Sequence, residues 1–149
     1  MYVIDLNVRK LLFATHVSHG KNSGENYATA FSNKHGSNQS SLGFYLTENT
    51  YQGKNGLSLI LNGLEKDIND KAKERAIVIH GADYCNPKFA KSAGRLGRSQ
   101  GCPALPYSVS TEVINAIKDG SVLFIYANNK IYTQQSPILS SINPKYAMN

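Results

Sequence analysis

The sequence has only two cysteines, few charged residues and no long hydrophobic run. Cys85 and Cys102 cannot build a disulfide framework, and they do not indicate a compartment. Charged residues make up 17% of the chain and hydrophobic residues 41%, proportions that exclude a disordered chain and a coiled coil. No segment approaches the roughly 18 apolar residues of a membrane-spanning helix, so we expect no integral membrane segment.

The start of the chain also lacks the features of a secretory leader. It has no charged start, apolar core or small-residue cleavage site of the kind that leaders carry. Residues 1–6 instead read as a strand, so we expect that an upstream segment has been trimmed or processed away. The 149 residues are long enough for one compact domain with a single core, and we expect residues 1–149 to form one.

Basic residues outnumber acidic ones. Sixteen lysines and arginines against ten aspartates and glutamates give a net charge of +6. Such a charge favours an anionic partner, which can be a nucleic acid, a membrane surface or a cell-wall polymer. Charge alone does not choose between these three.

Short apolar or β-branched segments, separated by polar and glycine-rich ones, predict a fold rich in strands. The expected strands span residues 2–6, 10–17, 42–47, 57–62, 76–79 and 122–126. Two long loops are expected at 19–41 and 81–107, and the polar tail after residue 134 is expected to cover the surface.

Two helices complete the expected architecture. Leu64, Ile68 and Ala72 recur every four residues, and a second helix is expected to begin at Ser110 and to end before Gly120. Together these patterns predict an α+β, β-rich fold, a small mixed sheet sandwich or barrel with two short helices.

One pair of segments contains the residue types used in nucleophilic catalysis. The strand at 76–79 leads to His80-Gly81, and eighteen residues later the chain reads Ser99-Gln100-Gly101-Cys102. A thiol attacks a carbonyl group as the thiolate, and an imidazole can take its proton. Glycine beside the sulfur allows a close approach of substrate, and backbone amides there can stabilise an oxyanion. From these residues alone, a buried structural cysteine and a strand-end histidine bonded to a carbonyl remain an open alternative.

These residues resemble the signature of the YkuD-type L,D-transpeptidases, a histidine-glycine pair followed after a spacer by Ser-His-Gly-Cys-x-Arg. The closer resemblance is to a subgroup, the murein L,D-transpeptidase catalytic domain proteins, in which Ser-Gln-Gly-Cys-Pro-Ala-Leu takes that place. It extends over nearly the whole chain, and the segments that carry it are 31–33, 40–45, 63–66, 79–84 and 97–105.

Two positions depart from the wider signature. Gln100 stands where the motif histidine is expected, and Ala104 stands where the arginine is expected. The motif histidine is not the base in the wider family, so Gln100 matters little. The missing arginine leaves recognition of a substrate carboxylate without a residue, and we expect Arg98 or Arg95 to supply it.

The resemblance implies an L,D-transpeptidase-like catalytic domain over 1–149 that acts on peptidoglycan stem peptides without a metal or cofactor. Cys102 would form an acyl-thioenzyme and expel the terminal D-alanine, with His80 as base and later acid. The amine of a second stem would then take the acyl group. The residues expected to shape the substrate and oxyanion site are Gly81, Tyr84, Arg98, Ser99, Gln100 and Gly101.

Three other functions remain open as alternatives. Water as acceptor would make the same site an L,D-carboxypeptidase. A second alternative is a non-catalytic basic module that binds the wall or nucleic acid, and a third is a zinc hydrolase that uses His16, His19 and His35. Cys85 is the rival nucleophile, in a context without small neighbours. The resemblance favours an extracytoplasmic enzyme without a nucleic-acid partner, and the oligomeric state is not predicted.

Overall fold

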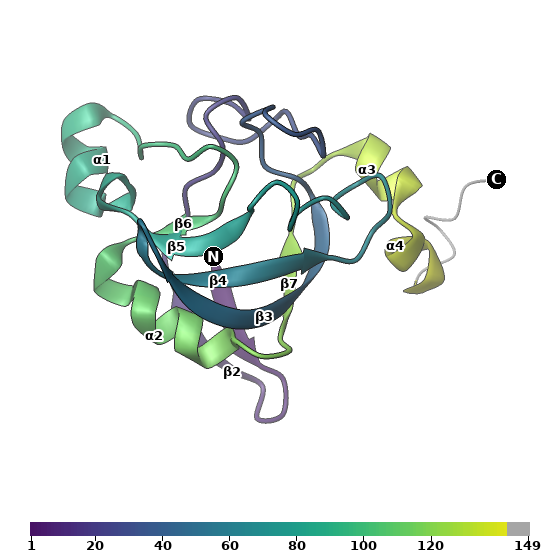
Figure 1. Cartoon of the computed structure of the whole chain (residues 1–149), viewed down its shortest axis with the longest axis horizontal. Helices are drawn as coiled ribbons and strands as arrows, with labels where there is room; N and C mark the ends of the chain where they lie inside the picture. The colour runs from purple at the N-terminus through teal and green to yellow at the C-terminus, as the bar shows by residue number, and fades with distance from the viewer. Residues whose placement is uncertain (143–149) are drawn as a thin grey trace.

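The computed structural model describes residues 1–142, and its centre is a curled five-stranded mixed sheet (Figure 1). Its strands are β3 (Gly43–Gly53), β4 (Gly56–Gly63), β5 (Val78–Gly81), β6 (Ala104–Leu105) and β7 (Val122–Ile125). Their order is β6-β5-β4-β3-β7, and only the β5–β6 pair is parallel. The sheet confirms the predicted α+β, β-rich class.

A separate two-stranded hairpin forms the N-terminus. β1 (Tyr2–Asp5) pairs antiparallel with β2 (Lys10–Ala14), and both strands lie within the predicted ranges 2–6 and 10–17. Val3 of this hairpin is buried in the main core, and Phe13 packs against that core. The hairpin therefore covers part of the sheet, although most of its apolar side chains stay exposed.

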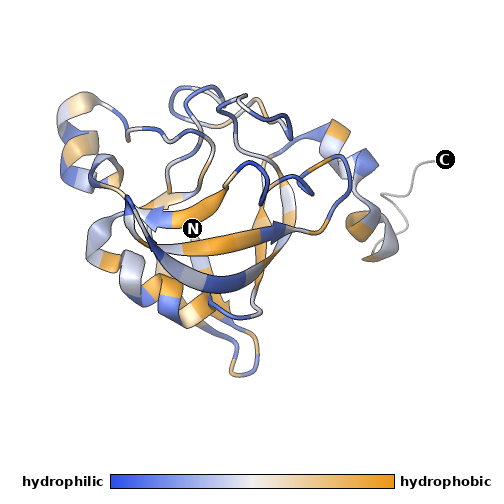
Figure 2. Cartoon of the chain, viewed as in Figure 1, coloured by the Kyte–Doolittle hydropathy of each residue, from blue (hydrophilic) through white to orange (hydrophobic). Residues whose placement is uncertain are grey.

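The main core lies between the curled sheet and α2 (Tyr107–Ile117). Leu59 and Leu61 of β4, together with Ile79 of β5, meet Val113 and Ile114 of the helix, and all are fully buried. Figure 2 shows hydrophobic stretches along β4 and β5 and mostly hydrophilic loops above the sheet. This packing holds β5 rigidly, and β5 is the strand that carries His80.

The expected helix over residues 64–72 is wrong. The chain forms consecutive turns there, because Asp67 adopts a left-handed conformation with φ of 63° that an α-helix cannot contain. The Asn69 side chain accepts a hydrogen bond from the Glu65 amide at 2.9 Å and so takes the place of a backbone partner. Of the three residues at four-residue spacing, only Ala72 is fully buried, whereas Leu64 is exposed and Ile68 is half-buried, so the spacing does not mark the buried face of a helix.

The second expected helix exists but begins earlier. α2 starts at Tyr107, directly after Pro106, and Ser110 lies buried within it rather than at its N-terminal cap. Proline before the first turn suits its fixed φ. Val113, Ile114 and Ile117 form its buried face.

A further helix interrupts the segment expected to be a loop at 81–107. α1 (Pro87–Ala93) follows a 3-10 turn at Asp83–Cys85. The Asn86 side chain accepts a hydrogen bond from the Lys88 amide, Pro87 begins the helix, and Gly94 ends it with φ of 76°. Lys88 and Lys91 therefore lie on a helix and not on the predicted solvated loop.

The end of the described chain forms two short helices instead of an irregular tail. These are α3 (Lys130–Gln135) and α4 (Pro137–Ile142). The fully buried Glu65 carboxylate accepts hydrogen bonds from the Tyr132 hydroxyl at 3.0 Å and from the Ser136 hydroxyl. It also accepts one from the Phe44 amide, so a single buried carboxylate ties these helices to the sheet. Residues 143–149, part of the predicted polar tail, lie outside the described residues.

None of the helices within residues 1–142 has the length and apolar character required to cross a membrane.

Candidate active site

A cavity of about 480 Å³, here called the Cys102 pocket, contains both the candidate nucleophile and the candidate base. Five parts of the chain line it: the loop at 35–38, the β3–β4 hairpin, residues 75–80 leading into and along β5, Tyr84, and the loop at 98–102. Cys102, His80, Tyr84, Arg98, Ser99 and Gln100 are among the lining residues. The structure therefore brings together residues that the sequence separates by as much as twenty-two positions.

His80 sits near the end of β5 and is almost completely buried, with 4% of its surface exposed. Its Nδ1 atom lies 2.8 Å from the Gly81 carbonyl oxygen. A carbonyl oxygen only accepts hydrogen bonds, so Nδ1 must carry the hydrogen in this contact. In the neutral ring Nε2 is then unprotonated, which is the state that a general base requires.

The pairing of β5 with β6 places Cys102 relative to His80. His80 lies opposite Ala104 and Gly81 opposite Leu105 in the parallel register. Carried back along the chain, this register brings Cys102 beside Val78, on the same side of the strands as His80, because alternate residues share a face. The Val78 amide accordingly lies close enough to favour the Cys102 thiolate.

Ser99 organises the turn that presents Cys102. Its buried hydroxyl accepts a hydrogen bond from the Gly101 amide at 3.0 Å and donates one to the Cys102 carbonyl oxygen at 2.6 Å. The backbone of Ser99 also pairs with the loop at 19–21, donating to the His19 carbonyl and accepting from the Lys21 amide. The side-chain and backbone hydrogen bonds of Ser99 thus fix the conformation of the turn.

Gly101 is required by the packing of this turn. Its φ is 130°, and a Cβ atom there would lie 2.9 Å from the Gln39 carbonyl oxygen and 3.0 Å from Ile77 Cδ1. Its amide is already bonded to Ser99, and its carbonyl accepts from the Ser40 hydroxyl. Within residues 1–142 the Cys102 amide has no hydrogen-bond acceptor other than its own sulfur, so Cys102, rather than Gly101, offers an N–H beside the thiol.

The Cys102 thiol is neutral in its ground state. Burial raises the pKa of the thiol, and the Val78 amide, Arg75 and Lys54 oppose this in decreasing order. The sulfur also lies 3.6 Å from the Ala76 carbonyl oxygen, which can accept the S–H. A thiol with a raised pKa needs a base to remove its proton at neutral pH.

Arg75 is a residue of the pocket that the sequence analysis missed. Its guanidinium donates four hydrogen bonds that hold the loop at 32–41 in place. The acceptors are the carbonyl oxygens of Ser32 and Gln39 and the hydroxyl groups of Ser37 and Ser41. All four are neutral, and among residues 1–142 no carboxylate forms an ion pair with Arg75. Its charge therefore stays uncompensated near the thiol.

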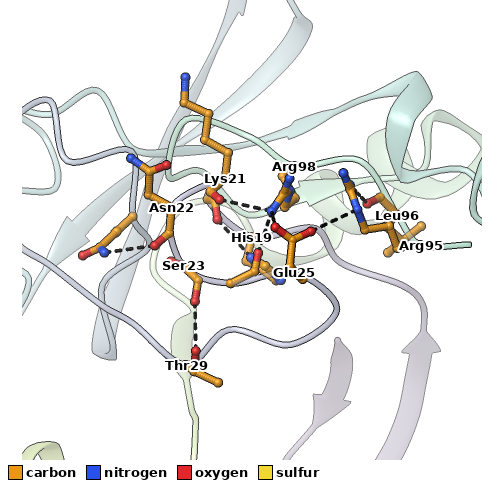
Figure 3. A network of polar contacts seen from close by, with 12 residues as sticks. His19, Lys21, Asn22, Ser23, Glu25, Thr29, Arg95, Leu96 and Arg98 are labelled. Carbon is orange, nitrogen blue, oxygen red and sulfur yellow. Dashed lines mark hydrogen bonds and ion pairs between the residues drawn. The ribbon is translucent and has the colours of Figure 1, made fainter. Parts of the chain in front are cut away.

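Arg98 and Arg95, the expected substitutes for the family arginine, are both paired with Glu25 (Figure 3). Arg98 lines the Cys102 pocket, but its Nη1 atom donates to Glu25 Oε1 at 3.0 Å and to the Gly24 carbonyl at 2.9 Å. Arg95 lines a separate cavity of about 230 Å³. A substrate contact by Arg98 stays a prediction, and the structure adds that Arg98 ties the 98–102 loop to the 19–25 loop.

Three other predicted residues lie at or beside the pocket. Gln100 is exposed on its lining, and Tyr84 lines it with its ring against Gly97. Burial raises the pKa of Tyr84 to about 12, so its hydroxyl stays protonated at neutral pH. Gly81 faces away, against Tyr107, and contributes through its carbonyl oxygen.

Cys85 is fully buried outside the Cys102 pocket, and its sulfur donates to the Ala104 carbonyl at 3.0 Å. Burial raises the pKa of its thiol. Both cysteines are free thiols. This environment fits a structural cysteine better than a nucleophile.

The histidines considered for zinc do not gather. His35 lines the Cys102 pocket, whereas His19 lines the smaller cavity and bonds the Gly20 carbonyl oxygen at 3.0 Å. Within the described part of the chain, no three histidine, cysteine or acidic side chains are placed to hold a metal ion. The ligand set that a zinc hydrolase needs is therefore not formed by these residues.

The sequence matches the family model described as the L,D-transpeptidase catalytic domain over residues 1–126. The chain belongs to this family. The match covers all five strands of the sheet, the Cys102 pocket and α2, and it ends before α3. A comparison with curated proteins finds no match.

For this L,D-transpeptidase domain, two pocket residues went unnoticed in the sequence. Arg75 lies three residues before the start of β5, the buried strand that contains His80, and this position is the one local signal that could have singled it out. Lys54 lies in a Lys-Asn-Gly turn, which signals a hairpin but not a place in the pocket.

Proposed function

We propose that this L,D-transpeptidase domain acts on peptidoglycan stem peptides through a Cys102 acyl-thioenzyme, with His80 as the general base. The observation that carries the proposal is the shared pocket of Cys102 and His80, where Nδ1 of the imidazole is held by the Gly81 carbonyl oxygen. Family membership supports a role in the cell wall. We also propose that the Ser99–Leu105 segment marks the subgroup of murein L,D-transpeptidase catalytic domain proteins.

The first half of the reaction forms a thioester. His80 Nε2 takes the proton of the Cys102 thiol as the sulfur attacks the carbonyl carbon of the L,D peptide bond. The oxyanion is stabilised by the Cys102 amide, whose N–H lies beside the sulfur. When the intermediate collapses, the C–N bond breaks and the amine of the terminal D-alanine leaves with the proton from His80.

The second half transfers the acyl group. The amine of a second stem peptide attacks the thioester carbonyl and gives a proton to His80, and the C–S bond breaks. A cross-link forms, and the sulfur takes the proton back from His80. Arg75 supports both halves electrostatically, because its charge favours the thiolate over the thiol.

The pocket carries the charge that this substrate needs. Lys54, Arg75 and Arg98 line it, and none of the aspartates or glutamates within residues 1–142 does. Stem peptides carry carboxylates, and an anion in a partly dry groove requires a cationic or amide partner. We expect the enzyme to work outside the cytoplasm, where the wall polymer is.

Incubation with purified tetrapeptide muropeptides tests the proposal. Intact-protein mass spectrometry should show the chain gain the mass of an acyl tripeptide, and product analysis should show free D-alanine. A cross-linked dimer identifies transpeptidation, and a free tripeptide identifies hydrolysis by water. If the unmodified chain forms neither the adduct nor any product, the proposed function is wrong.

A further inference from the structure

Among the described residues, three cationic side chains line the Cys102 pocket, and they differ in what they bind. Arg98 donates to Glu25 and to the carbonyl oxygens of Lys21 and Gly24, so its charge is paired (Figure 3). Its side chain is only 19% exposed. All of these contacts come from Nη1, and the carboxylate of Glu25 already balances the charge of the guanidinium, so Arg98 attracts a second anion less strongly than an unpaired cation does.

Arg75 is committed in another way. Both of its terminal nitrogens donate to protein acceptors, two hydrogen bonds from each. These contacts leave the guanidinium fork without a free pair of N–H groups for a substrate carboxylate. Arg75 therefore acts through its field and through the loop at 32–41, and not as a direct ligand.

Lys54 is different from both arginines. Its side chain is exposed, lines the pocket, and makes no hydrogen bond or ion pair with any residue that the structure describes. It sits in the turn between β3 and β4, where Gly53 pairs with Gly56 and Gly56 adopts φ of 79°. This tight turn fixes the backbone from which the ammonium group reaches the pocket.

We propose that Lys54 is the residue that binds a carboxylate of the stem peptide, in the role left open by Ala104. This inference rests on the proposed function and names its missing specificity residue. The lysine ammonium group has three N–H donors at the end of a flexible aliphatic chain, and it can therefore bind a carboxylate that approaches from solvent. The positive charge of Lys54 also lowers the pKa of the Cys102 thiol, against the larger opposite effect of burial, so Lys54 lies within electrostatic range of the reacting sulfur.

The stem peptide offers this carboxylate at two places, its C-terminal D-alanine and the side chain of its third residue. The experiment measures binding by calorimetry to the Cys102→Ala chain, which cannot turn the peptide over. The probes are a tetrapeptide with a C-terminal acid, the same peptide as its C-terminal amide, and a pair that differs only by a carboxylate on the third side chain. Each is titrated against Lys54→Met, Lys54→Arg and the control Lys118→Met, whose exposed lysine lies outside the pocket.

Lys54→Met should weaken binding of the carboxylate-bearing peptide about tenfold, as expected for a lost charge-assisted hydrogen bond. In one of the two probe pairs, it should also abolish the preference for the peptide with the carboxylate over the peptide without it. That pair identifies the carboxylate that Lys54 binds. Lys54→Arg and Lys118→Met should keep that preference. Retention of the preference by Lys54→Met, or the absence of peptide binding to the parent, overturns the inference. Lys54-dependent binding without any acyl adduct on the unmodified chain would instead overturn the chemistry proposed for Cys102.

Discussion

The Ser99 hydroxyl donates a hydrogen bond of 2.6 Å to the carbonyl oxygen of Cys102. The oxygen of the same Ser99 hydroxyl accepts a hydrogen bond from the Gly101 amide, so one small side chain closes the turn that carries the thiol. Ser99 is buried, and both of its partners would lose their bond if the hydroxyl were removed. The position of the sulfur in the pocket therefore depends on a residue that need not touch the substrate.

Ser99→Ala should lower the free energy of unfolding by about 1–3 kcal/mol, the cost of leaving buried polar groups without partners. It should also slow acylation of Cys102, because the turn loosens. Urea unfolding followed by circular dichroism and the rate of adduct formation measure the two effects. Ser92→Ala is the control, because Ser92 is exposed on α1 and its hydroxyl bonds only the Phe89 carbonyl. Equal stability of the two variants would contradict the role given to Ser99.

Substitution of the two cysteines should have opposite effects on the acyl adduct. Cys102→Ser should abolish the acyl adduct and leave the fold intact, since a hydroxyl is a much weaker nucleophile under a base arranged for a thiol. Cys85→Ser should keep both adduct and turnover, because Cys85 lies outside the Cys102 pocket and its sulfur already acts as a donor to the Ala104 carbonyl. Intact-protein mass spectrometry with a tetrapeptide donor measures both. Loss of the adduct in Cys85→Ser alone would move the nucleophile to Cys85.

Much of the fold follows from short-range patterns in the sequence. The expected strands near β3, β4, β5 and β7 are found because each is a short apolar run bounded by glycine or polar turns. The segment at 64–72 misled because its four-residue spacing matches a helix, whereas Asp67 turns the backbone into the left-handed region. α1 carried its own signals, Asn86-Pro87 at the start and Gly94 at the end, but it has only two turns of helix.

Only those parts of the candidate site that are contiguous in the sequence were predictable. The order of His80-Gly81 and Ser99–Cys102 was visible, and the structure places both segments at one pocket. The role of Arg75 depends on partners such as Ser32 and Gln39, more than thirty positions away, which no local pattern reveals. The pairing of Arg98 with Glu25 spans 73 positions and was equally invisible.

His80→Ala should slow acylation by about 10²–10⁴-fold, the usual contribution of a general base. The thiol remains in place, so alkylation by iodoacetamide at alkaline pH should persist in this variant. His80→Gln serves as a second variant that fills more of the buried space. If both variants acylated at the parental rate, His80 would have only a structural role.

Alkylation of Cys102 should become faster with increasing pH and level off above pH 9. Burial raises the pKa of the thiol above its ordinary value of 9.0, and only the thiolate reacts. A raised pKa means a smaller thiolate fraction at any given pH, so the profile shifts toward alkaline pH relative to a free cysteine. The measurement uses the Cys85→Ser background and intact mass against time. A midpoint below that of a free cysteine would contradict the neutral thiol inferred from the structure.

Comparison of Arg75→Met with Arg75→Lys should distinguish the effect of the Arg75 charge on Cys102 from the effect of its hydrogen bonds to the loop at 32–41. Both lose most of the four hydrogen bonds to the loop at 32–41, and Arg75→Met should lower the free energy of unfolding by about 2–4 kcal/mol. Only Arg75→Met removes the positive charge that lowers the pKa of Cys102. The midpoint of the alkylation profile should therefore rise further in Arg75→Met and stay near the parent in Arg75→Lys. Identical midpoints in the two variants would show that the charge of Arg75 does not act on the thiol.

Arg98→Ala tests whether this arginine binds substrate or tethers a loop. In the structure its guanidinium bonds Glu25 and the Gly24 carbonyl, so removal should release the 19–25 loop from the 98–102 loop. A tether predicts that Glu25→Ala reproduces part of the effect, because it removes the partner and leaves Arg98 in place. A substrate contact predicts the opposite for Glu25→Ala, since an unpaired Arg98 would bind an anionic peptide more tightly.

The measurement that decides is kcat/KM for one tetrapeptide donor in both variants. With Arg98 as a tether, both values should fall, and the susceptibility of the 19–25 loop to limited proteolysis should increase in each. With Arg98 as the carboxylate ligand, Arg98→Ala alone should lose about 1.5–3 kcal/mol of transition-state binding, while Glu25→Ala matches or exceeds the parent. The short contacts to the loop and the paired charge favour the tether, and a gain of activity in Glu25→Ala would show that this interpretation is wrong.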